Sequence, residues 1–475
     1  MADFQISTTA GGTAVLSSAA LADFTERFCG GLISQSHPEY NSARAVHNGM
    51  IDRYPALIAL CNTPSDVVVA VNFARENGIL VSVRGGGHSA PGLGVCDGGL
   101  VIDLAGLNEI HVDPEARTAW VGGGCRWAEV DQATSEHGLA TVSGIIANTG
   151  VAGLALGGGH GHLTRKYGLT IDNILAADVV LADGRLVRAS REENPDLFWA
   201  IRGGGGNFGV VTAFQFQLHP VTTVVAGPTF WPLEQAGDVL RWYRDFIVNA
   251  PEELNGFFAY LTVPPAPPFP EELHMKKVCG IVWCYAGPEE NADEIFKPIR
   301  EFGTPLMHGV QPMPYVALQG AFDGLYPAGL QWYWKADFVR ELTDEAIDIH
   351  LQHGPEMPTW LSTMHLYPID GAVHRVGRNE TPFNFRDVTW SQVIVGIDPD
   401  PALKDTLTTW TRNYWDALHP HSAGGAYLNF MMDEGQDRIK ATYGDNYQRL
   451  TEIKARYDPG NFFRVNQNIK PATGV

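Results

Sequence analysis

The chain has 475 residues, and 33 Lys and Arg stand against 53 Asp and Glu, which gives a formal net charge of −20. A chain of this length holds two or three domains with substantial cores, and so negative a charge disfavours binding to nucleic acid or to an anionic membrane surface. Glycine contributes 52 residues, well above ordinary usage of about 7%, and gathers in four clusters rather than in the period of three typical of collagen. We therefore expect loops in which bare backbone closely approaches a ligand.

The six cysteines have no CxxC or metal-finger spacing, so we expect reduced and mostly buried thiols. The N-terminal residues lack a positively charged segment followed by a continuous apolar one. No window approaches the ~18 apolar residues that a membrane span requires. These features predict a cytoplasmic protein that does not cross a membrane.

Helical and extended stretches alternate in the first half of the chain. A helix is expected to begin at an N-cap on Ser65 and to end before Gly78. The pattern predicts strands at 79–83, 100–104, 178–182 and 210–218, a helix at 126–137 and a helical turn at 193–202. Such alternation is typical of α/β or α+β folds.

The second half has a different texture, with proline clusters and longer alternating stretches. Strands are predicted at 257–263, 277–284, 361–367 and 388–397, and amphipathic helices at 233–248, 343–353 and 401–418. This pattern favours an antiparallel sheet covered on one face by helices. We expect a first domain over 1–220 with its core at 51–220, a second domain over 221–420, and a segment over 421–475 that returns to the first domain.

The four glycine clusters lie at 84–89, 122–124, 157–161 and 203–209. Two of them match a dinucleotide-binding GxGxxG or GxGxxA pattern, but Gly209 leads into a strand and Ala90 into a loop, whereas that motif needs a following helix. An NAD-type site is therefore disfavoured. The cluster that starts at Arg84 follows a strand and is suited to an anion nest for a diphosphate. A glycine-rich bend with a capping histidine is the alternative.

Five segments together resemble one family. They are RGGGHS at 84–89, VIDL at 101–104, GLALGGGHGHLTRKYGLTIDN at 153–173, DLFWAIRGGGGNFGVVTAFQFQL at 196–218 and YDPGNFFRVNQNI at 457–469. They are similar to the FAD-linked oxidases of the berberine bridge enzyme type, in the vanillyl-alcohol-oxidase superfamily. The resemblance implies an α+β fold, with a PCMH-type FAD-binding domain beside a substrate domain built on an antiparallel sheet.

The resemblance also implies the cofactor, FAD, and its attachment. His88 matches the residue that carries the flavin covalently, and the alternative is an unattached His88 that only contacts the diphosphate loop. Ile146 stands where many members have a second linking cysteine, so a single link is expected. The residues assigned to FAD in this way are Arg84, Gly85, Gly86, Gly87, His88, Ser89, Gly150, Gly153, Gly158, Gly159, Gly161, Gly209, Val210, Val211, Asn429, Asn466 and Asn468.

Four residues are candidates for catalysis. The resemblance places Tyr427 on a strand that passes the flavin, facing the substrate, although it is alternatively an aromatic wall. A tyrosine needs a neighbouring cation or strong donor to act as a base, and Lys335 is a candidate for that cation, or else forms a structural salt bridge. His365 and Tyr367 share one face of a strand because they are two residues apart.

Two further groups of residues are weaker candidates. Arg386 and Trp390 are candidates for gating the pocket at the end of the sheet. His160 and His162 lack the companion ligands of a metal site, so no metal is expected.

The sequence thus predicts an enzyme, an FAD-dependent oxidase. It removes a hydride from a C–H next to a hydroxyl or an amine of a small organic substrate and reduces O2 to H2O2. The alternatives are a flavin-dependent oxygenase or oxidative cyclase of secondary metabolism, and a flavin-binding protein without turnover. The expected partners are a small molecule and O2. The sequence does not specify the substrate or the oligomeric state.

Overall fold

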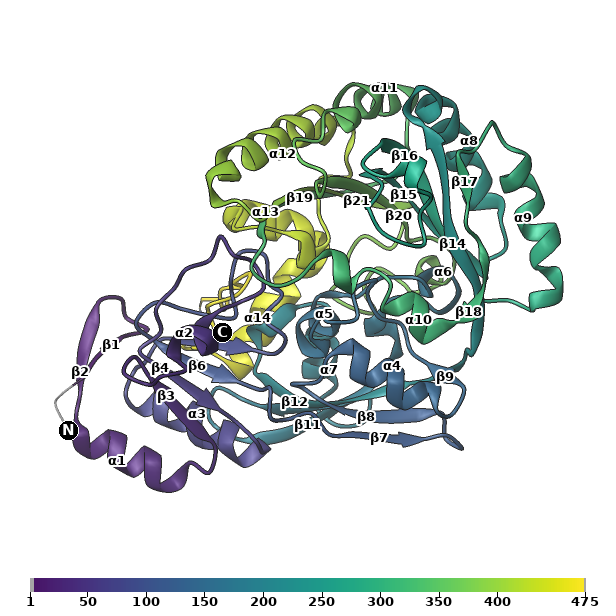
Figure 1. Ribbon diagram of the computed structural model, residues 1–475. Coiled ribbons are helices and arrows are strands. Elements are labelled where there is room, and N and C mark those ends of the chain that lie inside the picture. The colour runs from purple at the N-terminus through teal and green to yellow at the C-terminus, as the bar shows by residue number, and fades with distance from the viewer. Residues whose placement is uncertain (1–3, 474–475) are drawn as a thin grey trace.

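The computed structural model describes residues 4–473, and its first half contains two sheets (Figure 1). The first is mixed, because β4, β6 and β5 are parallel and β3 pairs antiparallel with β4. Its strands in spatial order are β3 (Gly31–Ser34), β4 (Leu57–Leu60), β6 (Leu100–Asp103) and β5 (Val81–Arg84). Near this sheet lie the hairpin β1 (Phe4–Ser7) and β2 (Thr13–Leu16) and the helices α1 (Ser18–Arg27), α2 (Tyr40–Arg44) and α3 (Pro64–Glu76).

The second sheet is antiparallel. Its strands in order are β11 (Leu186–Ser190), β10 (Ile174–Val180), β12 (Val210–Gln217), β8 (Thr118–Gly122) and β7 (Ile110–Asp113). The helices of this region are α4 (Trp127–Ser135), α5 (Val151–Gly157), α6 (Thr164–Tyr167) and α7 (Pro195–Ile201), and a short pair joins β9 (Leu139–Ala140) to β13 (His219–Pro220). The strands and helices expected in this half are present, with ends shifted by a few residues.

Helix α3 starts earlier than expected. Its N-cap is Thr63 rather than Ser65, and the Thr63 hydroxyl and the Asp66 carboxylate form a reciprocal capping box. Pro64 occupies the first turn, where its missing N–H costs nothing. Gly78 follows the helix with a φ of 63°, as the C-terminal cap requires.

The second half is built on one large antiparallel sheet. Its strands in order are β17 (Met307–His308), β14 (Thr223–Pro232), β16 (Lys277–Tyr285), β15 (Leu254–Thr262), β20 (Thr363–Pro368), β21 (Trp390–Asp398) and β19 (Gln331–Val339), and β18 (Gln311–Pro314) pairs with β14. The sequence reading missed β14 and β19. Both carry prolines or several tryptophans, which obscure a simple polar–apolar alternation.

Helices cover one face of this sheet, as predicted (Figure 1). They are α8 (Ala236–Asn249), α9 (Ala292–Glu301), α11 (Asp344–His353) and α12 (Lys404–Leu418), while α10 (Tyr315–Gln319) packs on α4 instead. Trp231, Trp283 and Trp390 are fully buried in the core between sheet and helices. The opposite face of the sheet is turned toward the first half of the chain, and side chains of both halves share one core there.

The C-terminal segment, with α13 (Gly435–Tyr443) and α14 (Tyr447–Tyr457), packs against the first half. The buried ammonium of Lys454 pairs with Asp458 at 2.6 Å and donates to the carbonyls of Asn207 and Phe463.

The expected domain limits stay predictions. Five of the six cysteines are buried and all are unpaired. Within residues 4–473, every helix is too short or too polar to span a bilayer.

Candidate active site

A cavity of about 360 Å³ lies between the two halves of the chain. One wall is made of the loop that follows β5, the start of α5 and the start of β12. The other wall is the face of the large sheet that helices leave uncovered, and residues 427–431 and 463–467 of the C-terminal segment complete it. Three parts of the sequence therefore meet at one site.

Glycines bring two backbone segments together at the first wall. A Cβ on Gly86 would lie 2.4 Å from the backbone nitrogen of Gly150, so the two loops touch through bare backbone. Gly87 has a φ of 72°, a conformation that turns successive N–H groups toward one side. At Gly153 and Gly206, by contrast, a Cβ would meet nothing within 4 Å, and both residues line the cavity. This wall is therefore a cradle in which backbone is exposed to a ligand.

Arg84 stands at the start of this loop, but its charge is already paired. Its guanidinium donates to Asp103 from Nε at 3.0 Å and from Nη2 at 2.5 Å, and Nη1 donates to the carbonyl of Ala45. Both partners of the ion pair are buried. Arg84 therefore braces β5 against β6, which differs from the expectation that its charge is directed at a diphosphate.

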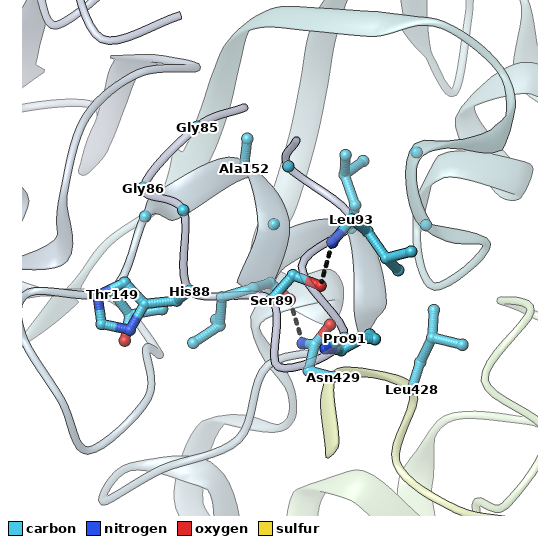
Figure 2. Close-up of a pocket in the computed structure, with 18 of the residues that line it drawn as sticks. Gly85, Gly86, His88, Ser89, Pro91, Leu93, Thr149, Ala152, Leu428 and Asn429 are labelled. Atoms are coloured by element: carbon cyan, nitrogen blue, oxygen red, sulfur yellow. Dashed lines mark hydrogen bonds between the residues drawn. The ribbon is translucent and has the colours of Figure 1, made fainter. Parts of the chain in front are cut away.

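His88 lies farther along the same loop, and Figure 2 shows it reaching toward Thr149. Its ring stacks on that of His47, with centroids 4.0 Å apart and planes 16° from parallel. Burial lowers the pKa of His88 to about 3 and that of His47 to about 4. Both imidazoles are therefore neutral at pH 7, so His88 offers a nitrogen lone pair at the cavity wall.

Tyr427 begins a short 3₁₀ turn, Leu428–Phe430, where a strand was expected. Its buried phenolic oxygen accepts hydrogen bonds from the backbone N–H of Gly159 at 2.9 Å and from the Asn429 amide at 2.7 Å. Burial raises the pKa of Tyr427 to about 12, although these donors and the backbone of His160 oppose the rise. The expected strong donors are thus neutral N–H groups and not a cation.

His365 and Tyr367 lie on β20 and line the cavity together, as their spacing predicts. Nδ1 of His365 lies 2.6 Å from the hydroxyl of Tyr367. Burial lowers the pKa of His365 to about 3 and raises that of Tyr367 well above its usual value. The pair is therefore an uncharged imidazole and an uncharged phenol joined by one hydrogen bond.

Several expected site residues lie elsewhere. Lys335 is outside the cavity wall, forms an ion pair with Glu434 and lies 4.1 Å from the ring of Trp415. The salt-bridge alternative is therefore the one found. Of the residues assigned to FAD, Gly158, Gly159, Gly161 and Asn468 do not line the cavity.

The two proposed gating residues are also away from the cavity. Arg386 is buried in a bidentate pair with Asp172, at 2.7 Å on both sides, and does not line the cavity. Trp390 lies in the core beneath the helices. Gating by these two residues is therefore wrong, because the strand that carries Trp390 turns it away from the cavity.

Other residues of the cavity were not assigned to FAD binding or catalysis from the sequence. His160 lies within 4.5 Å of the Tyr427 ring centroid and 4.9 Å of that of Tyr367, and neither of its nitrogens has a hydrogen-bond partner among the described residues. Trp332 and Trp334 on β19 line the sheet wall of the cavity. The two tryptophans share a face of β19 because they are two residues apart, but this follows only once 331–339 is known to be a strand.

Comparison with known families matches residues 55–190 to an FAD binding domain and residues 426–470 to the berberine and berberine-like family. The chain is 32% identical to an FAD-linked oxidoreductase of Dictyostelium discoideum, over 88% of this chain and 89% of the relative. It is 30% identical to (R)-6-hydroxynicotine oxidase of Paenarthrobacter nicotinovorans, over 92% and 96% respectively. The crystal structure of 6-hydroxy-D-nicotine oxidase from Arthrobacter nicotinovorans matches with a TM-score of 0.83 at 26% identity, covering 94% of this chain and 98% of that one.

The fold and the cavity, together with these similarities, define an FAD-linked oxidoreductase. The chain belongs to the berberine-like family of these enzymes, which confirms the resemblance read from its motifs and the α+β fold with a PCMH-type FAD domain. The residues present fit FAD. Gly153 and Gly206 leave open space on the cavity side, and the loop at Gly85–Gly87 offers bare backbone to a diphosphate.

Proposed function

We propose that the protein is an oxidase that takes a hydride from a carbon bearing a hydroxyl or an amine and passes the electrons to O2, forming H2O2. The observation that carries this proposal is the phenolic oxygen of Tyr427, which meets N–H donors of Gly159 and Asn429 at the wall of the cavity. Similarity to an enzyme named as an oxidase supports O2 as the acceptor.

When bound, FAD supplies an isoalloxazine ring that accepts the hydride. In the proposed arrangement, backbone N–H groups at Gly85–Gly87 and Gly150 hold its diphosphate, since no Cβ obstructs their approach. Residues 209–211 border its adenine and ribose, and Asn466 borders its ring. All of these residues line the cavity.

Tyr427 has the role of a base for the substrate's hydroxyl or amine proton. Two N–H groups already point at its oxygen, so they favour the phenolate over the phenol and stabilise the charge that appears when the proton leaves. Asn429 also donates to the carbonyl of Leu154, which fixes its amide against helix α5. We therefore assign Asn429 to holding Tyr427, in addition to bordering FAD.

His88 is proposed to carry FAD through a single covalent bond. A neutral imidazole has the lone pair that such a bond needs, and burial and His47 keep His88 neutral. Ile146 lines the cavity where a second link would need a thiol. The proposal is therefore one link, through the histidine alone.

Denaturation of the purified holoenzyme in acid or SDS tests the link. Flavin fluorescence on the protein band is expected for the wild type and its loss is expected for His88→Ala, and release of all flavin from the wild type refutes the covalent bond. Oxidase activity is tested by comparing O2 consumed with H2O2 formed. Equal amounts support an oxidase, and label from ¹⁸O2 in the product refutes it in favour of an oxygenase.

A further inference from the structure

The wall that the large sheet gives to the cavity carries no ionic charge. It consists of Tyr326 and side chains of three strands, namely Trp332, Trp334, Thr363, His365, Tyr367, Val393, Val395 and Ile397. Within residues 4–473, no Asp, Glu or Lys lines any part of the cavity. Its two arginines, Arg84 and Arg464, belong to the FAD side, where Arg84 pairs with Asp103 and Arg464 donates to backbone carbonyls.

The register of the strands explains this neutral surface. Trp334 pairs with Val395 and Val395 with Thr363, so these three side chains form one row across β19, β21 and β20. Val393 and His365 form the next row. Charged Lys335 and Asp337 lie on β19 outside the cavity wall, where each forms an ion pair.

Aromatic rings line much of this side of the cavity. The ring centroids of Trp332 and Trp334 lie 5.8 Å apart, and Phe430 lies 5.9 Å from Trp334 and 6.1 Å from Tyr367. Such surfaces stack on a planar ring and gain about 0.5–1.5 kcal/mol per pair beyond burial. The aromatic lining of this wall therefore favours an aromatic ligand.

The polar groups of the wall are few and uncharged. His365 and Tyr367 form one hydrogen-bonded pair, which can exchange hydrogen bonds with a single hydroxyl. The indole N–H groups of Trp332 and Trp334 have no partner among the described residues and are donors only. An ammonium group would find no carboxylate among the described side chains that line the cavity.

The same surface disfavours a cationic amine and an oligosaccharide. An ammonium would be buried without a carboxylate, and cation–π contacts worth about 0.5–2 kcal/mol do not offset the several kcal/mol that burying an unpaired charge costs. An oligosaccharide would bury many hydroxyl groups, and each one left unpaired costs about 1–3 kcal/mol. Only a substrate with few polar groups suits this wall.

We propose that the substrate is an uncharged aromatic alcohol, whose ring lies against Trp332 and Trp334 and whose hydroxyl meets the His365–Tyr367 pair. This inference rests on the proposed oxidase function. The reaction converts R–CH2OH and O2 into R–CHO and H2O2. The C–H bond is broken as a hydride, the O–H proton passes to Tyr427 and the C=O bond forms. Both hydrogens and two electrons end on O2.

Anaerobic calorimetric titration at pH 7 of the holoenzyme whose flavin has first been reduced with dithionite tests the substrate class without turnover, because a reduced flavin cannot accept the hydride. The matched probes are 2-naphthylmethanol, 2-naphthylmethylamine, which is cationic at this pH, and xylobiose. We expect the alcohol to bind at least about 100-fold more tightly than the amine, the ratio that an unpaired buried charge implies, and xylobiose not to saturate. Equal binding of alcohol and amine, or tighter binding of the amine or of xylobiose, overturns the inference.

Substitutions in the wall test whether its lack of charge sets the preference for the alcohol over the amine. Val395→Asp places a carboxylate between Trp334 and Thr363, and it is expected to reduce the preference for the alcohol at least about tenfold relative to the isosteric neutral Val395→Asn. If that variant does not fold, Thr363→Asp against Thr363→Asn serves the same purpose. An unchanged preference in the folded aspartate variant overturns the inference.

Turnover in air with the same probes separates the two proposals. Tight alcohol binding without H2O2 formation contradicts the oxidase function, whereas H2O2 formed faster from the amine contradicts the substrate class and leaves the oxidase function standing. H2O2 formed from the alcohol in preference to the other two probes supports both.

Discussion

A buried carboxyl between the two halves of the chain makes a pH-dependent prediction. Asp131 on α4 is 2% exposed, and its Oδ2 accepts a hydrogen bond from the amide of Gln319 on α10 at 3.2 Å. Oδ1 of Asp131 and Oε1 of Gln319 have no partner among the described residues. The change to test is Asp131→Asn, which keeps the shape and the acceptor and supplies an N–H for the Gln319 oxygen.

The size of the expected change in stability follows from the pKa of the Asp131 carboxyl. Burial raises the pKa of Asp131 from 3.8 to about 7, and the nearby Asp323 acts in the same direction. Between pH 3.8 and about pH 7 the folded chain keeps a proton on Asp131 that the unfolded chain releases, so the free energy of unfolding falls as pH rises. The full decrease, about 4 kcal/mol, is reached above pH 7. From pH 5 to pH 8 the loss is about 2.5 kcal/mol, because part of it has already occurred at pH 5.

Thermal unfolding of the holoenzyme at pH 5 and pH 8 measures the effect. The advantage of Asp131→Asn over the wild type should grow by about 2.5 kcal/mol between these pH values, which corresponds to about 2–3 °C in the midpoint for a chain of this length. The exposed Asp405→Asn on α12 is the control and should follow the wild type at both pH values. The same advantage at pH 5 as at pH 8 would refute the assignment of a neutral, buried Asp131.

Three further predictions concern the cavity and its surroundings. Tyr427→Phe should lower kcat/KM by about 10²–10⁴-fold. Because the pKa of Tyr427 is raised to about 12, wild-type activity should keep rising with pH into the alkaline range, and the variant should lose this rise. Stopped-flow measurement of flavin reduction across pH 7–10 checks both expectations. Gly153→Leu should fill the open cradle, and absorbance near 450 nm of the folded variant should then show FAD missing. Lys335→Met should leave the buried Glu434 with only the longer ionic contact to Arg438, at 3.7 Å, and lower stability by about 1–3 kcal/mol. The pH profile of activity should stay unchanged, and a displaced profile would return Lys335 to the catalytic group.

Local rules account for the parts of the fold that the sequence predicted. The helix after residue 63 was expected because cap, proline and terminal glycine lie within one short stretch, and the structure differs only in using Thr63. The strands at β15, β16, β20 and β21 were expected from their alternation. The edge strand β19 was missed because Trp332, Tyr333 and Trp334 are consecutive aromatic residues, which hide the period of two.

Among the catalytic candidates, too, the local relations were predicted and those that depend on tertiary structure were not. His365 and Tyr367 were placed together correctly, since two residues on one strand necessarily share a face. Lys335 was misplaced because one residue along a strand separates the cavity face from the opposite one, and only the register decides which is which. The Gly159 donor to Tyr427 was not predictable, because Gly159 lies 268 positions away in the chain.

The sequence by itself determined the cofactor class and the part of the molecule that receives it. A diphosphate needs close backbone approach, which glycine favours, and glycines of the clusters at 84–89 and 203–209 do line the cavity, while the resemblance of the motifs to a known family implied FAD itself. The tertiary structure decided the substrate wall. The charge of −20 lies outside the cavity, and the wall is neutral and aromatic because three strands distant in sequence pair in one register and turn the same face inward.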